Sequence, residues 1–242
     1  MSASTIYRVI GLMSGTSLDG LDIALCTFQK KDRWEFSIEL AETIPYPQER
    51  TTRLAGLHLL SGEQLQREHA DYGRYLGEEA KKFLHRHSAS ADFIASHGHT
   101  VFHRPEEGYT FQAGCGAALS ATAGLPVVHD FRTADIALGG QGAPLVPIGD
   151  RLLFGSYDGC LNLGGIANIS YEKSGKRIAY DVSPCNLLLN HLAQRLGKPY
   201  DAGGELAAAG KCDQLLLEKL KHIPYGYKKW YYTGRLEGMI TE

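Results

Sequence analysis

The stretch IGLMSGTSLDGLDIAL, residues 10–25, places a run of small and polar residues between two apolar segments. The apolar segments predict β-strands over residues 6–12 and 20–28, joined by a tight connection. Residues 14–20 supply three hydroxyl side chains, two glycines and a carboxylate. A tight turn needs only one or two such residues. We therefore interpret the connection as a candidate ligand-binding loop.

The composition of this loop suits a phosphate group. Gly15 and Gly20 lack a Cβ atom, so we expect them to take positive φ angles and to let a ligand approach the backbone. The hydroxyl groups would add donors beside exposed backbone N–H groups. Asp19 and Asp22 would hold a hydrated Mg²⁺ ion or order the loop. The loop lacks the Gly-Lys-Ser/Thr of a P-loop and no helix begins there, so a plain hairpin turn stays an equal alternative.

Outward from the hairpin, the first half of the chain alternates strand and helix signals. The predicted strands are residues 6–12, 20–28, 34–44, 92–98, about 109–111 and 126–131. The predicted helices are residues 47–60, residues 61–87 with Ser61 as N-cap, and a helix of small residues within 113–125. Short connections between the first three strands predict an antiparallel meander.

A second series of elements follows residue 155. Three strands are predicted over residues 160–165, 168–173 and 176–182, then a helix over residues 185–197, and the last residues, 228–242, are expected to form a helix-like tail. Three strands and a helix thus occur twice, which is a coarse internal repeat. Duplicated mixed sheets with helices predict an α/β protein with two lobes and a cleft between them.

The composition restricts the class of protein. The chain has 242 residues and a net charge of −2, which gives no general attraction to nucleic acid or acidic membranes. No apolar run approaches the ~20 residues that span a bilayer, and the first residues do not resemble a signal peptide. The five cysteines are scattered, which predicts buried, reduced thiols in a cytoplasmic protein.

Three histidines, His97, His99 and His103, lie within seven residues of one another. A zinc site is one hypothesis, because imidazole is a common zinc ligand. No cysteine or glutamate cluster accompanies them, so we favour a polar sugar-binding edge, with ordinary loop histidines as the alternative.

Arg132 follows a predicted buried strand and lies between Asp130 and Asp135. Its planar guanidinium would pair with a carboxylate of a ligand. An internal pair with one of the two aspartates is an equal alternative. The glycine-rich residues 139–144 after it predict a hinge or a substrate loop.

Asp181 is predicted at the end of a strand, facing a cleft, where a carboxylate can act as a general base. Many such aspartates merely cap the next helix, so this alternative also stays open.

Five segments together, in this order along the chain, resemble the anhydro-N-acetylmuramic acid kinase family. They are GLMSGTSLDGLDIAL, SHGHTVFH, HDFRTADIALGGQGAPLVP, LNLGGIANIS and AYDVSPCN, all within residues 8–190. The resemblance implies a sugar kinase/Hsp70/actin (ribonuclease H-like) fold. Residues 1–155 would form a complete first lobe, with the phosphate loop and the sugar-binding segments, and residues 156–242 the start of an incomplete second lobe.

The resemblance also implies an activity and its partners. The family acts in the cytoplasm on 1,6-anhydro-N-acetylmuramic acid recovered from cell-wall turnover. Water opens the anhydro bridge at C1 while ATP phosphorylates O6, which gives N-acetylmuramic acid 6-phosphate. The expected partners are therefore this sugar and ATP with Mg²⁺, not nucleic acid or a membrane, and a homodimer is one assembly to expect.

The resemblance assigns roles residue by residue. Asp181 matches the aspartate that activates the attacking water. His97, Gln112 and Arg132 would bind the sugar, and no residue is assigned to a resident metal ion. The ATP phosphate loop would consist of Gly15, Thr16, Ser17, Leu18, Asp19, Gly20, Leu21 and Asp22.

The chain departs from the family pattern in three respects. It reads Asp-Val-Ser-Pro-Cys-Asn at residues 181–186, where the family has Asp-Thr-Gly-Pro-Gly-Asn, and His-Gly-His-Thr at residues 97–100, where the family has His-Gly-Gln-Thr. It also has no counterpart of the family's later glycine-rich adenosine-binding segment. A non-catalytic sugar- or phosphate-binding fragment is therefore the alternative to an active kinase.

Overall fold

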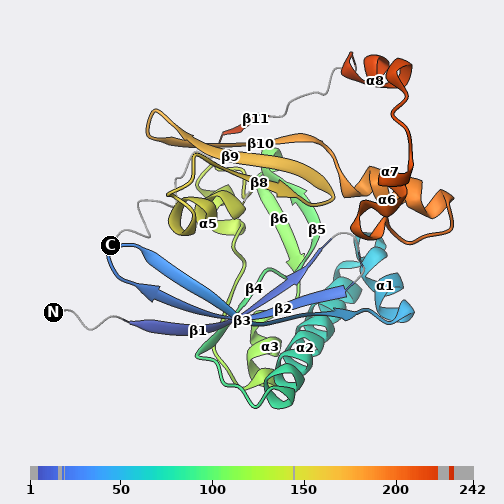
Figure 1. The fold of residues 1–242 in the computed structure, drawn as a ribbon. Coiled ribbons are helices and arrows are strands. Elements are labelled where there is room, and N and C mark those ends of the chain that lie inside the picture. The colour runs from blue at the N-terminus through green and yellow to red at the C-terminus, as the bar shows by residue number, and fades with distance from the viewer. Residues whose placement is uncertain (1–4, 16–17, 19, 144, 223–228, 232–242) are drawn as a thin grey trace. The chain divides into compact units, whose positions relative to one another are not determined.

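The computed structural model describes residues 5–15, 18, 20–143, 145–222 and 229–231 (Figure 1). The described residues divide into two compact units, the first ending at Leu145 and the second beginning at Val146. The division after residue 155 that the family resemblance implies stays a prediction.

A five-stranded mixed sheet forms the centre of the first unit. Its strands, in spatial order, are β3 (Trp34–Pro45), β2 (Gly20–Lys30), β1 (Ile6–Ser14), β4 (Phe93–Ser96) and β7 (Val127–His129). The first three strands of the chain pair antiparallel, as the meander prediction requires, whereas β4 and β7 continue the sheet in parallel with β1. The carboxyl ends of β1, β4 and β7 therefore meet at one edge of the sheet.

A separate two-stranded hairpin, β5 (His99–Arg104) and β6 (Tyr109–Ala113), follows β4, with the 3-10 turn η2 (Pro105–Glu107) between its strands. Only the second of these strands was predicted. Gly98 turns the chain with a φ of 69°, and a Cβ there would lie 2.5 Å from the carbonyl oxygen of Ala113. The glycine thus ends one strand and lets the hairpin pack tightly against its own base.

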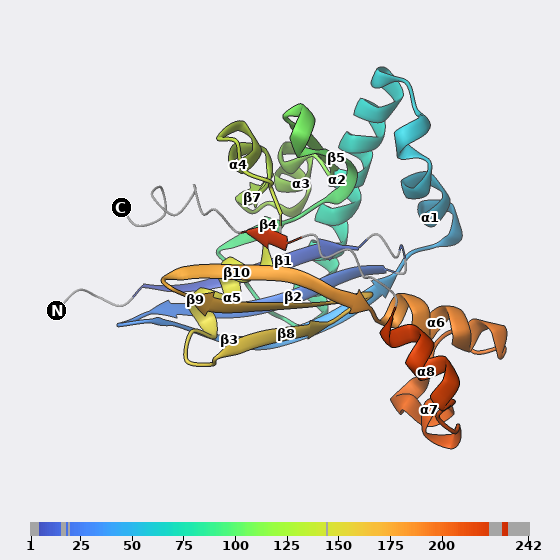
Figure 2. The ribbon, with the colours of Figure 1, turned by 90° about the horizontal axis from the view of Figure 1, so that it is seen from above.

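The helices of the first unit cover one face of its sheet, as Figure 2 shows for α2 and α3. They are α1 (Gln48–Ala55), the 3-10 turn η1 (Leu57–Leu59), α2 (Gly62–Arg86), α3 (Gly116–Ala123) and α4 (Thr133–Ala137). The helix predicted over residues 47–60 is thus two pieces that meet at Gly56. Ser61 caps α2 as predicted, in a reciprocal capping box with Gln64.

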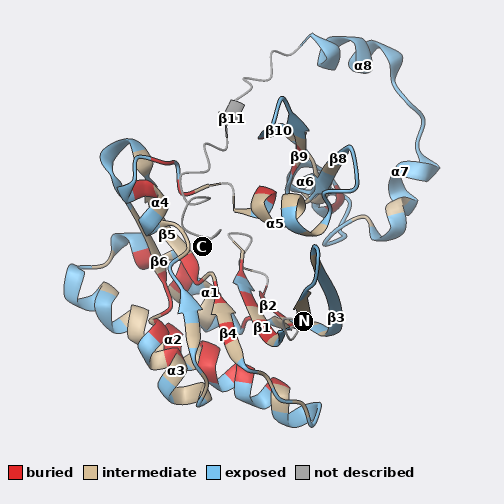
Figure 3. Ribbon diagram, turned by 90° about the vertical axis from the view of Figure 1, so that its left-hand side faces the viewer, coloured by how far each residue is buried: buried red, intermediate tan, exposed pale blue. Residues whose placement is uncertain are grey.

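The hydrophobic core of this unit lies between the sheet and α2 (Figure 3). Alternate residues of β1 and β2 point into it, and Tyr72, Leu76 and Phe83 of α2 meet them, each at most 1% exposed. These three residues recur at helical spacing, so they lie on one face of α2. On the opposite face of the same strands, Met13 and Asp22 are exposed.

The second unit contains a four-stranded antiparallel sheet in the order β11 (Lys229–Tyr231), β10 (Lys176–Pro184), β9 (Ile166–Lys173) and β8 (Gly159–Leu163). Its helices are α5 (Val146–Leu153), α6 (Asn186–Arg195), α7 (Glu205–Ala209) and α8 (Gln214–Lys221), with the 3-10 turn η3 (Ala202–Gly204). The predicted series of three strands and a helix is confirmed. The helix-like tail is corrected in part, because residues 229–231 pair with β10 as a strand, and the other residues of this prediction, 228 and 232–242, lie outside the described residues.

These elements confirm a mixed α/β fold, and its ribonuclease H-like class stays what the family resemblance implies. All five cysteines are free, but four are half-buried and Cys212 is exposed, so the prediction of buried thiols is wrong. Among the described residues, no helix is both long enough and apolar enough to cross a membrane.

Two glycines of α2 let this helix approach α3 closely. A Cβ at Gly73 would lie 2.4 Å from the carbonyl oxygen of Cys115, and a Cβ at Gly77 would lie 2.8 Å from that of Leu119. Both distances are shorter than any contact that a real methyl group makes with backbone oxygen. The glycines are therefore required by packing, although each lowers the intrinsic helix propensity of α2 by about 1 kcal/mol relative to alanine.

We predict that Gly73→Ala lowers the free energy of unfolding by about 1–3 kcal/mol, the usual cost of overpacking, despite the better helix propensity of alanine. Gly62→Ala is the matched control on the same helix, because nothing lies within 4 Å of its added Cβ. Urea denaturation measures both variants. A stability of Gly73→Ala equal to or above that of the control would contradict the close packing of α2 on α3.

Candidate functional site

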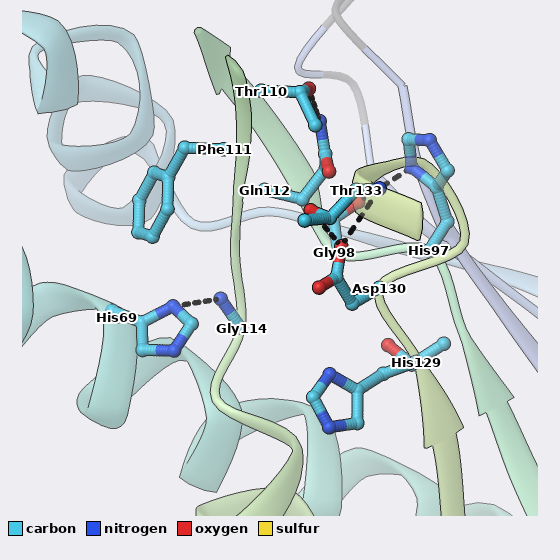
Figure 4. A pocket seen from close by; sticks show the side chains of 11 residues that line it. His69, His97, Gly98, Thr110, Phe111, Gln112, Gly114, His129, Asp130 and Thr133 are labelled. Carbon is cyan, nitrogen blue, oxygen red and sulfur yellow. Dashed lines mark hydrogen bonds between the residues drawn. The ribbon is translucent and has the colours of Figure 1, made fainter. Parts of the chain in front are cut away.

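A cavity of about 220 Å³ opens at the carboxyl ends of β4 and β7 in the first unit (Figure 4). Its lining comes from α2, from the ends of β4 and β7, from β6, and from the segments that follow these strands. Parallel neighbours end at the same edge of a sheet, which is where α/β proteins commonly bind ligands. His97 and Gln112, two of the predicted sugar-binding residues, both line it.

Arg132, the third predicted sugar-binding residue, holds His97 in place. Its Nε and Nη2 atoms lie 3.1 Å and 2.9 Å from His97 Nε2, and its Nη1 donates to the carbonyl oxygen of Gly142 at 2.7 Å. Asp130 instead accepts from the Thr133 hydroxyl, and Asp135 accepts from the backbone N–H of Gly142. The alternative of an internal pair between Arg132 and one of these aspartates is therefore wrong.

These contacts fix the protonation of His97. Its Nε2 accepts from Arg132, and its Nδ1 lies 2.9 Å from the carbonyl oxygen of Gly98, which can only accept. The network therefore assigns the proton to Nδ1 of a neutral ring. Burial lowers the pKa of His97 below its ordinary value, and the adjacent charge of Arg132 lowers it further. His97 thus lines the cavity with a neutral ring whose orientation is fixed by hydrogen bonds.

The side-chain amide of Gln112 is oriented by a hydrogen bond to Thr110, which lies on the same strand, β6. Its Nε2 donates to the Thr110 hydroxyl at 2.7 Å, and that hydroxyl donates to the carbonyl oxygen of Phe102. The amide oxygen of Gln112 takes no part in this chain of hydrogen bonds. The cavity therefore gains an oriented amide from β6.

Further polar side chains to which the sequence assigns no role also line the cavity, among them His69 of α2, His129 of β7 and Ser96 of β4. His69 Nδ1 accepts from the backbone N–H of Gly114 at 3.2 Å, which leaves its Nε2–H as a donor (Figure 4). Burial lowers the pKa of His69, and His129 lowers it further. Ser96 and His129 are the first residues of two of the segments that resemble the family, whereas the position of His69 in the sequence carries no motif that would have identified it.

Ser96 is 1% exposed, and its hydroxyl is a buried polar atom with no hydrogen-bond partner in the part of the chain that the structure describes. Buried polar groups are nearly always paired with protein or ordered water. Because Ser96 also lines the cavity, a hydroxyl group or a water molecule in the cavity would supply the missing partner.

The predicted phosphate loop is described only in part: Thr16, Ser17 and Asp19 lie outside the described residues. Gly15 follows the last residue of β1. Leu18 has a φ of 58°, a left-handed backbone conformation that residues other than glycine rarely adopt.

The second end of the loop is packed into the sheet. Gly20 does not have a positive φ; a Cβ there would lie 2.7 Å from the carbonyl oxygen of Ile44, so close packing of β2 on β3 explains this glycine. Leu21 is fully buried in the core, which leaves only its backbone available to a ligand. Asp22 is exposed and accepts from the Thr43 hydroxyl at 2.6 Å.

Asp181 lies on β10 in the second unit, exposed, and does not end its strand. The strand continues to Pro184, and the pairing with β9 shifts between Asp181 and Ser183. The N-cap of the following helix α6 is Cys185, so the alternative that Asp181 caps this helix is wrong. Its role as a base stays a prediction.

The three clustered histidines take separate partners. His99 Nδ1 lies 3.1 Å from Ser14 Oγ, and His103 Nδ1 lies 3.2 Å from the Thr110 hydroxyl, whereas His97 contacts Arg132. Among the described residues, no group of three or more His, Cys, Asp or Glu is placed to hold a metal ion. The described geometry therefore does not favour the zinc hypothesis.

Four histidines, His69, His97, His99 and His103, have a pKa below the ordinary value of 6.5, in each case chiefly because of burial. The folded state therefore resists protonation that the unfolded chain accepts. Their contribution to stability is present above pH 6.5 and is lost as the pH falls below that value.

We predict that the thermal midpoint falls as the pH is lowered from 7.5 to 5, and that this fall is smaller in His99→Gln, because glutamine does not titrate. His58→Gln removes an exposed histidine and is the control. Differential scanning calorimetry measures each midpoint. An identical pH dependence in His99→Gln and the wild-type chain would show that burial of His99 does not resist its protonation.

The family profile described as anhydro-N-acetylmuramic acid kinase matches residues 7–236. Curated anhydro-N-acetylmuramic acid kinases from Paramagnetospirillum magneticum and Gloeobacter violaceus are each 40% identical to the chain, over 228 and 237 residues. Both alignments cover 89% of this chain and 62% of the relative. The chain thus spans less than two thirds of the length of these curated relatives.

Two solved structures are also similar. RuvC from Thermus thermophilus is 14% identical with a TM-score of 0.31, covering 62% of this chain and 81% of that chain. The ethanolamine utilization protein EutJ from Carboxydothermus hydrogenoformans is 14% identical with a TM-score of 0.33, covering 82% and 59%. Such scores are too low to support an argument. The profile match over most of the sequence shows that the chain belongs to the anhydro-N-acetylmuramic acid kinase family.

Proposed function

We propose that the chain acts in the ATP-dependent conversion of 1,6-anhydro-N-acetylmuramic acid to N-acetylmuramic acid 6-phosphate during cell-wall recycling in the cytoplasm, and that the cavity of the first unit binds the sugar. One observation carries this proposal. Two residues expected from the family to bind the sugar line one cavity, and the third, Arg132, holds one of these two.

The chemistry of the cavity suits a sugar. The neutral imidazoles of His69 and His97, with the amide and hydroxyl groups of the lining, offer donors and acceptors for sugar hydroxyls and an acetamido group. Arg132 uses three of its five N–H donors on His97 and Gly142. The remaining N–H groups of this cation can pair with the lactyl carboxylate that distinguishes muramic acid from glucosamine.

The connection between β1 and β2 is proposed to hold the phosphates of ATP. Asp22 fits a hydrated magnesium ion, because its exposed carboxylate engages one oxygen with Thr43 and retains the other, and Mg²⁺ is commonly held by one or two carboxylates, waters and the nucleotide phosphates. When bound, the ion would neutralise charge on the transferred phosphoryl group.

In the proposed reaction, Asp181 accepts a proton from water as the water oxygen bonds to C1 of the sugar. The C1–O6 bond breaks, its electron pair stays on O6, and O6 bonds to the γ-phosphorus of ATP as ADP leaves. Ring opening and phosphorylation are therefore linked, because O6 is not available as an acceptor while it is bonded to C1.

A second candidate is a chain that binds the sugar without phosphorylating it. Residues of the first unit alone line the cavity, and the chain spans only 62% of the length of curated relatives. Two measurements distinguish the kinase from the chain that only binds. Calorimetric titration with the anhydro sugar measures binding, and mass spectrometry after addition of MgATP detects the product. Binding with 6-phosphate formation supports the kinase, binding alone supports the second candidate, and absence of both overturns the proposed sugar site.

We predict that Arg132→Lys weakens sugar binding about tenfold or more, because lysine lacks the planar fork that contacts His97 and Gly142 together and each lost charge-assisted hydrogen bond is worth ~1.5–3 kcal/mol. Arg104→Lys, at the exposed end of β5, is the control. Anhydro-N-acetylglucosamine, which lacks the carboxylate, should lose less affinity. Unchanged affinity for the muramic sugar, with a lowered thermal midpoint, would leave Arg132 with a structural role only.

We predict that Asp181→Asn lowers product formation by about 10²–10⁴-fold in a single turnover, the usual contribution of a positioned base, while sugar and ATP affinities change little. Asp158→Asn removes an exposed carboxylate of the same unit and should have no effect. If the wild-type chain alone forms no product, both substitutions are measured in a chain extended to the length of its relatives. A rate near that of wild type would remove Asp181 from the mechanism.

A further inference from the structure

Four polar side chains form a buried chain of hydrogen bonds beneath the start of the proposed nucleotide loop. Tyr72 and Tyr46 share a hydrogen bond of 2.7 Å between their hydroxyl groups, Tyr46 donates to Ser14 Oγ at 2.9 Å, and Ser14 Oγ lies 3.1 Å from His99 Nδ1. None of the four is more than 9% exposed. They come from α2, the segment after β3, the end of β1 and the start of β5.

The chain of hydrogen bonds has one direction. Tyr46 donates its proton to Ser14, so it accepts from Tyr72. Ser14 then donates to His99 Nδ1, so that the hydroxyls of Tyr46 and Ser14 each donate once and accept once, Tyr72 donates at the start of the chain, and His99 carries its proton on Nε2. All members of the chain from Tyr72 to His99 Nδ1 are satisfied by one another.

Ser14 is the last residue of β1, paired with Leu21 of β2, and Gly15 follows it directly. The hydroxyl group of Ser14 points to the core side of the sheet. There it makes hydrogen bonds with His99 of β5 and with Tyr46. A further contact reaches the loop from α1: the Thr51 hydroxyl lies 3.4 Å from the carbonyl oxygen of Leu18. The end of β1 and the residues that follow it are therefore fixed by contacts from β5, from Tyr46 and from α1.

Packing alone does not require polar groups at these positions. A buried polar network stabilises a single arrangement only when every member is paired, and it penalises arrangements in which one member loses its partner. Here the arrangement selected is the direction in which the backbone leaves β1. That direction sets where the backbone N–H of Gly15, the first residue after the strand, points.

We propose that Ser14, Tyr46 and His99 are positioning residues for the nucleotide: they fix the exit of β1 so that the loop presents its backbone N–H groups to phosphate. This inference rests on the proposed role of residues 15–22 in binding ATP. None of the three is assigned to touch the nucleotide or the sugar.

Two measurements on the full chain test the inference. Titration calorimetry with the magnesium complex of a non-hydrolysable ATP analogue, and separately with the anhydro sugar, gives the two affinities. Hydrogen–deuterium exchange of the peptide that spans residues 14–22 reports on the loop without any ligand.

Tyr46→Phe removes the donor to Ser14 and keeps the ring. We expect it to weaken nucleotide binding about tenfold, to speed exchange in residues 14–22, and to change sugar affinity by less than about twofold. Tyr75→Phe is the matched control, because the Tyr75 ring stacks on Tyr72 in the same cluster while its hydroxyl is outside the chain of hydrogen bonds.

His99→Leu should repeat the loss of nucleotide affinity, and His99→Gln should restore most of it, because an amide oxygen can accept from Ser14. Unchanged nucleotide affinity and exchange in Tyr46→Phe and His99→Leu would overturn the inference and leave ATP binding standing. Equal losses for sugar and nucleotide would also overturn it, as a general packing defect. A wild-type chain that binds no nucleotide overturns the proposed function, and the exchange rates then decide alone whether the network holds the loop.

Discussion

The arrangement of the first unit depends on the burial of one face of its sheet against α2. Side chains alternate along a strand, so burial of Ile10, Leu12 and Ile23 fixes which neighbours lie inside and which outside. A shift by one residue would move the whole apolar set to the other face. The same alternation places Ser14 on the inner face, at the end of β1, and Asp22 on the outer face. The polar residues at the edge of the sheet are thus positioned by the apolar residues before them.

The same reasoning extends to β4, where Ile94 and Ser96 share the inner parity and His97 takes the outer one. Ser96 therefore remains buried beside the cavity, whereas His97 turns toward Arg132. Because β4 and β7 are parallel, their carboxyl ends bring His97 and His129 to one edge of the sheet. A cavity with several polar groups can form there without a break in the hydrophobic core below it.

Elements with local signals could be predicted from the sequence. The meander, the capped helix α2 and the second series of strands all follow from residue spacing and from Ser61. Contacts between distant residues could not be predicted. His69 lies in the middle of α2 and gains a role only because Gly114, 45 residues later, donates to it. Asp130 and Asp135 flank Arg132 in the sequence, but His97 and Gly142 are its partners in space.

His97 and His99 are separated by one residue and carry their protons on opposite ring nitrogens. The carbonyl oxygen of Gly98 can only accept, so His97 bears its proton on Nδ1, whereas the Ser14 hydroxyl donates to His99 and leaves the proton on Nε2. Burial keeps both rings neutral. In the proposed sugar site, Arg132 would then be the cation that recognises an anionic group, and a substrate carboxylate would meet one fixed guanidinium instead of a set of titrating imidazoles.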